Sequence, residues 1–110
     1  MERIYLEWED RLEDAVSDGR KFFVLVIYDI IDNKRRRYLV KVLEAFGIRV
    51  QKSAFECVLD RRRYDRLLKK APRCIEPTED SLRIYLLNGK MSVLIWGSDR
   101  PHEDDGPIIV

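Results

Sequence analysis

FFVLVIYDIID, residues 22–32, decides the fold: seven apolar or aromatic residues in a row precede a carboxylate at Asp29. Such a run is typical of a central β-strand that is buried on both faces. Strand alternation places Asp29 on the same face as Phe23, Leu25 and Ile27. A carboxylate is costly inside a core, so we expect Asp29 at the carboxyl end of the strand, where ligands often bind in α/β sheets.

A helix follows this strand. Asp32 or Asn33 caps it, because a short side-chain acceptor satisfies free amides of the first helical turn. Its core-facing stripe has helical spacing and consists of Leu39, Val42, Leu43 and Phe46. Gly47 is expected to end it with a positive φ. Residues 48–51 and 53–59 then form either a hairpin with a very short turn or one bent strand with a bulge.

The second half of the chain is expected to form one helix and two strands. Asp60 caps a second helix, which Pro72 stops. Its apolar stripe is Tyr64, Leu67, Leu68 and Ala71. Strands over 82–87 and 92–96 flank Asn88-Gly89, a hairpin signal. The order βαββαβ plus one strand predicts a ferredoxin-like α+β sandwich, and a second subunit in a homodimer is expected to cover the helix-free face.

Composition narrows the class of protein. No apolar run in the 110 residues approaches the length of a membrane span, and the first twenty residues do not resemble a signal peptide. Cys57 and Cys74 have no metal-ligand spacing, so we interpret them as reduced thiols of a cytoplasmic protein, with one disulfide as the alternative. We expect no membrane partner.

Charge divides the chain into three parts. Residues 1–20 carry three arginines against seven acidic residues, residues 21–100 carry 18 basic against 10 acidic residues, and residues 101–110 carry three acidic residues only. We therefore predict an acidic extension (residues 1–21), a domain (22–97) and a tail (98–110). In the extension Trp8, Leu12, Ala15 and Val16 have helical spacing. A basic middle suggests a polyanionic partner, although an unevenly charged solvated surface would give the same counts.

Two arginine triplets are candidate nucleic-acid-binding groups: Arg35, Arg36 and Arg37, and then Arg61, Arg62 and Arg63. Each triplet opens a predicted helix, where cations oppose the helix dipole. Helix amino ends with arginine side chains are good phosphate binders. The alternative is that both are solvated basic turns.

Asp29 is the candidate metal ligand and catalytic residue. Mg²⁺ often takes one or two carboxylates and completes its shell with water and phosphate oxygens. If two copies of the first strand meet across a symmetry axis, their two Asp29 side chains would share one Mg²⁺ (or Mn²⁺) ion. Asp32 is a weaker candidate because it caps the helix, and Asp29 has the alternative of a polar strand end bonded to nearby amides. His102, the one histidine, lies in an acidic tail, which disfavours a histidine triad or a zinc site.

Two motifs resemble a known family. Val26-Ile27-Tyr28-Asp29-Ile30 with Asp32-Asn33-Lys34-Arg35-Arg36, followed by the segment Gly47–Glu56 that contains Ser53 and Phe55, resemble the small CRISPR-associated Cas2 proteins of spacer acquisition. The resemblance covers roughly residues 22–96. It implies a ferredoxin-like homodimer whose last strand packs on the partner's sheet, with the residue matching Asp29 as the Mg²⁺ ligand.

The same resemblance leaves two functions open. Some members are described as metal-dependent endonucleases of RNA or double-stranded DNA. Others are non-catalytic scaffolds that bridge two dimers of the CRISPR integrase partner and hold the spacer duplex, with the integrase engaging the segment that corresponds to about residues 97–110. This chain departs from the family in its twenty preceding residues. Their charge predicts that they screen the basic surface, so that deleting them tightens duplex binding at low salt.

Overall fold

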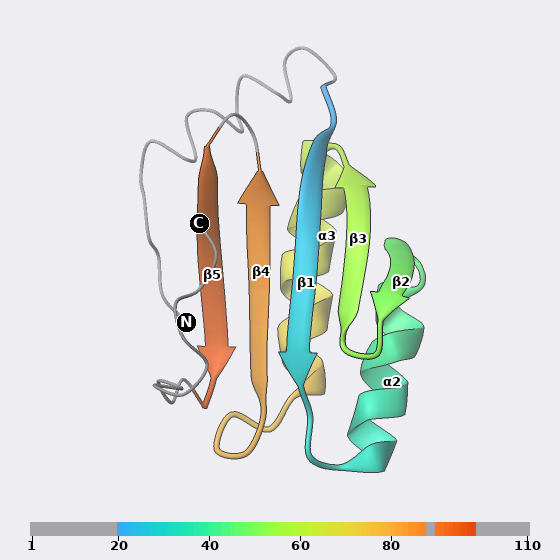
Figure 1. Cartoon of the computed structure of the whole chain (residues 1–110), viewed down its shortest axis with the longest axis vertical. Coiled ribbons are helices and arrows are strands. Elements are labelled where there is room, and N and C mark those ends of the chain that lie inside the picture. Colours follow the sequence, from blue (N-terminus) through green and yellow to red (C-terminus); the bar gives the residue numbers. More distant parts are fainter. Residues whose placement is uncertain (1–19, 88–89, 99–110) are drawn as a thin grey trace.

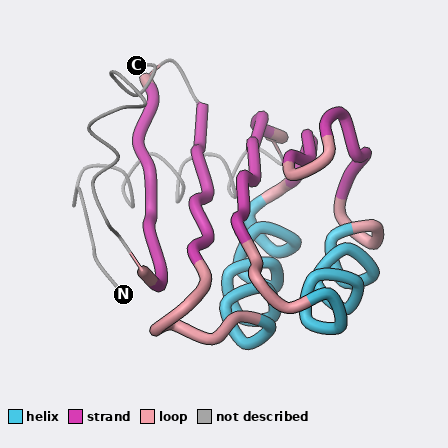
Figure 2. The backbone as a smooth tube through the Cα atoms, turned by 60° about the horizontal axis from the view of Figure 1, so that its bottom comes forward, coloured by secondary structure: helices cyan, strands magenta, loops and turns pink. Residues whose placement is uncertain are grey.

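The five strands in the described part of the chain form one antiparallel sheet in the order β2-β3-β1-β4-β5 (Figure 1). The structure is a computed structural model and describes residues 20–87 and 90–98. The elements are β1 (Phe22–Asp29), α2 (Asn33–Leu43), β2 (Gly47–Gln51), β3 (Ala54–Leu59), α3 (Arg61–Lys70), the 3₁₀ helix η1 (Ala71–Cys74), β4 (Ser81–Leu87) and β5 (Met91–Gly97). Both long helices cover one face of the sheet (Figure 2). The predicted ferredoxin-like α+β sandwich with an added strand is confirmed.

The core lies between the sheet and the helices. Every second residue of β1 faces it, because successive side chains of a strand point to opposite faces. Val24 and Val26 are fully buried there. The helix stripes predicted from spacing supply the opposing layer, with Leu39 and Leu43 from α2 and Leu67 from α3 at zero exposure. Both predicted caps are confirmed: Asp32 Oδ2 accepts the Arg35 N–H at 2.9 Å, and Asp60 Oδ1 accepts the Arg63 N–H at 2.8 Å.

The other face of the sheet, here called the open face, carries none of the described helices and is apolar. Phe23 is 36% exposed and Ile27 is 37% exposed, so the expectation that β1 is buried on both faces is wrong for the single chain. The register aligns Phe23 with Val58 and Leu87, two further exposed apolar residues of that face. Within the described part of the chain, the open face is therefore an apolar sheet surface without a covering helix.

Gly47 has a different role from the predicted one. Helix α2 ends at Leu43, and Gly47 begins β2; among the described glycines only Gly97 has a positive φ. A Cβ atom at Gly47 would overlap the carbonyl oxygen of Glu56 and the Cys57 sulfur. Glycine is required here because β2 approaches β3 closely, and not because the helix end needs a left-handed residue.

The remaining strands agree with the predictions in outline. β2 and β3 form a hairpin, so the first alternative for this segment is confirmed and the single bent strand is wrong; the register of the hairpin shifts between Arg49 and Gln51. β4 and β5 pair antiparallel as the Asn88-Gly89 signal predicts, although those two residues lie outside the described residues. In the single chain β5 pairs with β4 of its own sheet. The predicted helical spacing in residues 1–19 and the tail residue His102 also lie outside the described residues.

Candidate metal and nucleic-acid site

Asp29 is the last residue of the central strand. It pairs with Ser81, the first residue of β4, and Ser81 pairs with Gly97 at the end of β5. Alternation puts Asp29 on the helix-free face with Phe23 and Ile27, as predicted, and its side chain is exposed. No hydrogen bond or ion pair to the Asp29 carboxylate occurs within the described residues. The alternative that nearby amides hold its carboxylate is therefore not found there.

A complete metal site is not assembled by the described part of one chain. Residues 20–87 and 90–98 contain no group of three or more His, Cys, Asp or Glu side chains placed to hold an ion. Asp29 nevertheless suits Mg²⁺ chemically, because it is an accessible carboxylate without a competing cation, and Mg²⁺ requires only one or two such ligands. A site at Asp29 needs donors from outside this set, such as a second chain, water or a substrate phosphate.

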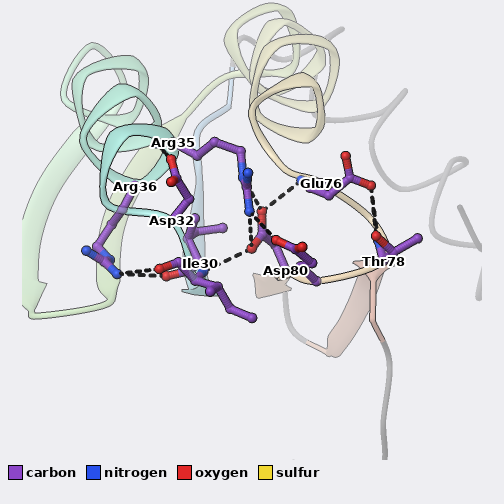
Figure 3. Close-up of polar contacts among 9 residues, drawn as sticks. Ile30, Asp32, Arg35, Arg36, Glu76, Thr78 and Asp80 are labelled. Carbon is purple, nitrogen blue, oxygen red and sulfur yellow. Dashed lines mark hydrogen bonds and ion pairs between the residues drawn. The ribbon is translucent and has the colours of Figure 1, made fainter.

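The turn that follows Asp29 is tied to a buried carboxylate, Asp80, which has zero exposure (Figure 3). Asp80 Oδ1 accepts the Ile31 N–H at 3.0 Å, and Oδ2 accepts the Glu76 N–H at 2.8 Å. The Asp80 carbonyl accepts the Ser98 N–H at 2.7 Å. Asp80 thus joins the β1–α2 turn, the loop before β4 and the end of β5, and it fixes the backbone two residues after Asp29.

Arg35 belongs to this network. Its Nε donates to Asp80 Oδ2 at 2.8 Å. Its Nη2 donates to Asp80 Oδ1 at 3.2 Å and to Glu79 Oε1 at 2.9 Å. Burial alone would raise the pKa of Asp80, but the hydrogen bonds from Arg35 and from the Glu76 and Ile31 amides hold it below its usual value. The guanidinium of Arg35 is therefore occupied by two carboxylates, so this candidate nucleic-acid residue already has an anionic partner.

Arg36 clamps the same turn from its other side (Figure 3). Its Nη2 donates to the carbonyl oxygens of Ile30 at 2.9 Å and Ile31 at 3.3 Å, and its Nη1 contacts the side-chain oxygen of Asn33. The Ile31 N–H donates to Asp80, which Arg35 holds, and the Ile31 carbonyl accepts from Arg36. Arg35 and Arg36 thus shape the turn after Asp29, a role that the basic run in the sequence does not reveal.

Arg37 points elsewhere and lines a groove between α2 and η1. The groove has a volume of about 620 Å³. Its lining residues are Asp32, Lys34, Arg35, Arg37, Tyr38, Lys41, Arg73, Cys74, Ile75 and Glu76. Sequence reasoning missed Lys41 and Arg73 as parts of this surface, because 32 positions separate them in the chain. Helical spacing from Arg37 could have indicated Lys41.

The second arginine triplet is not brought to the first. β3 runs antiparallel to β1, so the helix after β3 starts at the opposite end of the sheet from the helix after β1 (Figure 1). Arg61 Nε forms an ion pair with Asp65 at 3.0 Å, and Arg62 is exposed. The Arg63 guanidinium lies 5.6 Å from the centre of the Phe46 ring. Arg61 and Arg62 therefore do not extend the basic surface around Arg37.

Known proteins resemble this chain in sequence and in fold. The sequence model of the family "CRISPR associated protein Cas2" matches residues 22–92. The chain belongs to the CRISPR-associated Cas2 family. A Cas2 endoribonuclease of Mycobacterium tuberculosis is 45% identical over 82% of this chain and 79% of that protein. A Cas2 endoribonuclease of Synechocystis is 38% identical over 81% of this chain and 99% of that protein.

Solved structures agree with this membership. A hypothetical protein of Thermus thermophilus, TT1823, matches with a TM-score of 0.59 and 43% identity, covering 67% of this chain and 90% of that one. Streptococcus pyogenes Cas2 matches with a TM-score of 0.56 and 33% identity, covering 61% of this chain and 87% of that one. The family and the fold are thus supported by independent comparisons.

The residues that carry the Cas2 resemblance lie around the end of β1. The Ser53 carbonyl accepts the Tyr28 N–H at 3.1 Å, and the Tyr28 hydroxyl donates to the Lys52 carbonyl at 3.0 Å. Phe55 is fully buried, and its ring centre lies 6.4 Å from that of Tyr28. Ser53 and Phe55 therefore support the residue before Asp29 and do not reach the open face themselves.

Two further expectations concern the cysteines and the lack of a membrane span. Cys57 and Cys74 are separate free thiols, both buried, so the alternative of a disulfide between them is not found. Burial raises the pKa of the Cys57 thiol to about 11. None of the described helices has the length and apolar character needed to cross a membrane.

Proposed function

We propose that this protein acts in CRISPR spacer acquisition as a homodimeric, Mg²⁺-dependent endonuclease, with Asp29 as the metal ligand. The observation that carries the proposal is an exposed carboxylate at the end of the central strand, without a partner among the described residues and on an apolar face that no described helix covers. Curated relatives named Cas2 endoribonuclease, and one from Thermus thermophilus named Cas2 endonuclease, support the reaction class. Cleavage of RNA and cleavage of double-stranded DNA are both consistent with it.

A second copy of the chain is the proposed cover of the open sheet face. Exposed apolar side chains of β1, β3 and β4 align across this face, namely Phe23, Ile27, Val58 and Leu87. Burying such a surface against itself is favourable, and two-fold symmetry is the commonest arrangement. Since Asp29 ends the same face, a two-fold axis near the end of β1 would bring two Asp29 carboxylates together.

Each part of the chain then has a defined task. The paired Asp29 carboxylates would hold Mg²⁺ (or Mn²⁺), which when bound supplies an activated water and offsets charge on the phosphodiester. Asp80, Arg35 and Arg36 fix the turn after Asp29 and so hold the backbone that follows this carboxylate. Arg37 lies on the basic groove at the same end of the sheet and holds substrate phosphates. We also infer a cytoplasmic location, where free thiols such as Cys57 persist.

A cleavage assay with matched carboxylate variants tests the proposal. Asp29→Ala should abolish Mg²⁺-dependent cleavage of RNA and double-stranded DNA while leaving nucleic-acid binding intact. Asp32→Ser is the matched control, because it removes a neighbouring carboxylate and serine still caps α2. Equal cleavage by the parent and Asp29→Ala, at equal purity, would refute the catalytic role.

The dimer has its own test. Phe23→Glu places a charge on the open face and should shift the protein from dimer to monomer in light scattering. Ile31→Glu is the control, since Ile31 is 63% exposed but lies in the turn outside the sheet. A parent protein that is monomeric at the same concentration would contradict the shared metal site.

A scaffold without catalysis is the second candidate. It is favoured by exposed arginines of α2 and α3, such as Arg37 and Arg62, because these helices cover the sheet face opposite to that of Asp29. In this function the dimer bridges the CRISPR integrase partner and holds the spacer duplex. Asp29→Ala distinguishes the two functions, because a scaffold would support spacer integration by the partner at an unchanged rate.

A further inference from the structure

The groove between α2 and η1 concentrates cations that no other described residue neutralises. Lys34, Arg37, Lys41 and Arg73 line it, and none of them has a hydrogen bond or ion pair within residues 20–87 and 90–98. This separates them from Arg35, which two carboxylates hold. Like charges around one concave surface repel each other, so an anion bound there would relieve that repulsion.

The acidic residues of the groove are already engaged. The Asp32 carboxylate accepts the Arg35 N–H as the helix cap. Glu76 Oε2 accepts the Thr78 hydroxyl at 3.0 Å. Neither is paired with a cation of the groove, so the surface keeps an excess of positive charge.

An aromatic ring lies within this charged stripe. One face of α2 carries residues at i, i+3, i+4 and i+7, namely Lys34, Arg37, Tyr38 and Lys41. Tyr38 is 62% exposed, and its hydroxyl has no hydrogen bond within the described part of the chain. Cations flanking an exposed aromatic side chain are typical of surfaces that bind single strands, where phosphates contact the cations and bases stack on the ring.

The shape of the groove favours one strand over two. A volume of about 620 Å³ lies within the range for ligand pockets and is too small for a duplex to enter. Bases of a duplex are stacked on each other, so they do not present a free face to Tyr38. The groove also lies at the sheet end that carries Asp29, because α2 starts where β1 ends and η1 leads to the start of β4 (Figure 1).

We propose that the α2–η1 groove binds single-stranded nucleic acid, with Arg37, Lys41 and Arg73 on successive phosphates and Tyr38 stacked on a base. A strand held there leaves the groove at the sheet end where Asp29 lies. This inference rests on the proposed function, because it places in the groove the part of the substrate strand that lies next to the cleaved bond.

Fluorescence anisotropy with a labelled oligo-uridine, measured in an Asp29→Ala background to prevent cleavage, tests the groove. Arg37→Ala, Lys41→Ala and Arg73→Ala should each weaken binding and lower the salt slope by about 0.7 per lost phosphate contact. Arg66→Ala and Lys69→Ala, which remove exposed basic residues of α3 outside the groove, are the controls and should leave binding unchanged.

Tyr38→Leu separates stacking from charge. Loss of one stacked base is worth roughly 1–3 kcal/mol, so affinity should fall about 5- to 150-fold with no change in the salt slope. The proposal is overturned if the groove variants bind like the α3 controls, or if a hairpin duplex competes as well as the single strand and Tyr38→Leu has no effect. Groove-dependent binding without cleavage by the parent would instead refute the nuclease and leave the groove standing.

Discussion

Asp80→Asn is the most informative perturbation of the structure, because both oxygens of the Asp80 carboxylate act as hydrogen-bond acceptors. The Ile31 and Glu76 amides and the Arg35 guanidinium supply all four side-chain bonds. Asparagine replaces one acceptor oxygen with an NH₂ group. Either orientation of that amide directs an NH₂ group at a donor, so an isosteric change leaves at least one donor unsatisfied.

The size of the effect follows from these contacts. A buried backbone N–H that loses its acceptor costs roughly 1–3 kcal/mol. The ion pair with Arg35 is lost as well, although the Arg35 side chain is 31% exposed and keeps Glu79. We expect a loss of about 3 kcal/mol in the free energy of unfolding, and a fall in Tm of roughly 10–25 °C for a domain of this size.

Urea unfolding followed by circular dichroism measures this loss, with Glu79→Gln as the control. Glu79 is the exposed partner of the same arginine, and its removal should cost no more than about 1 kcal/mol. Hydrogen exchange adds a local readout, since the Ile31 and Glu76 amides should exchange faster in Asp80→Asn. Equal stabilities of the two variants, or unchanged exchange at both amides, would refute the reasoning.

Three more predictions follow from the same structure. The pKa of Asp80 is lowered in the folded state, so the contribution of its carboxylate to stability is complete above the unfolded pKa of about 3.9 and disappears as pH falls through the lowered value. The Tm of the parent should therefore fall over this acidic range, and the Tm of Asp80→Asn should fall less. Burial raises the pKa values of Cys57 and Cys74, so neither thiol should react with a disulfide reagent at mildly alkaline pH until guanidinium unfolds the protein; rapid labelling of the native protein would contradict their burial. Gly47→Ala places a Cβ against the Glu56 carbonyl and should lower the free energy of unfolding by roughly 1–3 kcal/mol, whereas an unchanged urea midpoint would show that β2 can move away.

Local chemistry made much of the fold predictable. Asp32 caps α2 within its own first turn, and Leu39 and Leu43 lie one helical turn apart, so neighbouring residues decide both features. Gly47 shows the limit of such reasoning. Its position after a helix favoured a positive φ, but the reason for glycine is contact with Glu56 on another strand. A single sequence does not reveal which backbone will lie against it.

The arginines show the same limit at the candidate site. Arg35 and Arg37 are two residues apart in one basic run, yet Arg35 is held by Asp80, 45 positions along the chain, while Arg37 faces the groove. Arg61 opens a similar run, but the antiparallel course of β3 places its helix at the far end of the sheet. The arginine runs correctly predicted that both helices begin with cations. The topology of the sheet decides which of these cations lie on the same surface.

The pleat of the sheet gives two carboxylates at one strand end opposite roles. Asp29 pairs with Ser81, and Asp80 is the residue before Ser81. A shift of one position along the chain changes the face, so Asp80 lies beneath the helices and accepts four hydrogen bonds, while Asp29 stays exposed on the open face. A carboxylate already bonded to four donors has no lone pair to offer an ion, whereas its neighbour has all of them. Asp80 therefore uses its acceptors to hold the turn, and Asp29, at the strand end beside that turn, keeps its oxygens available for a ligand.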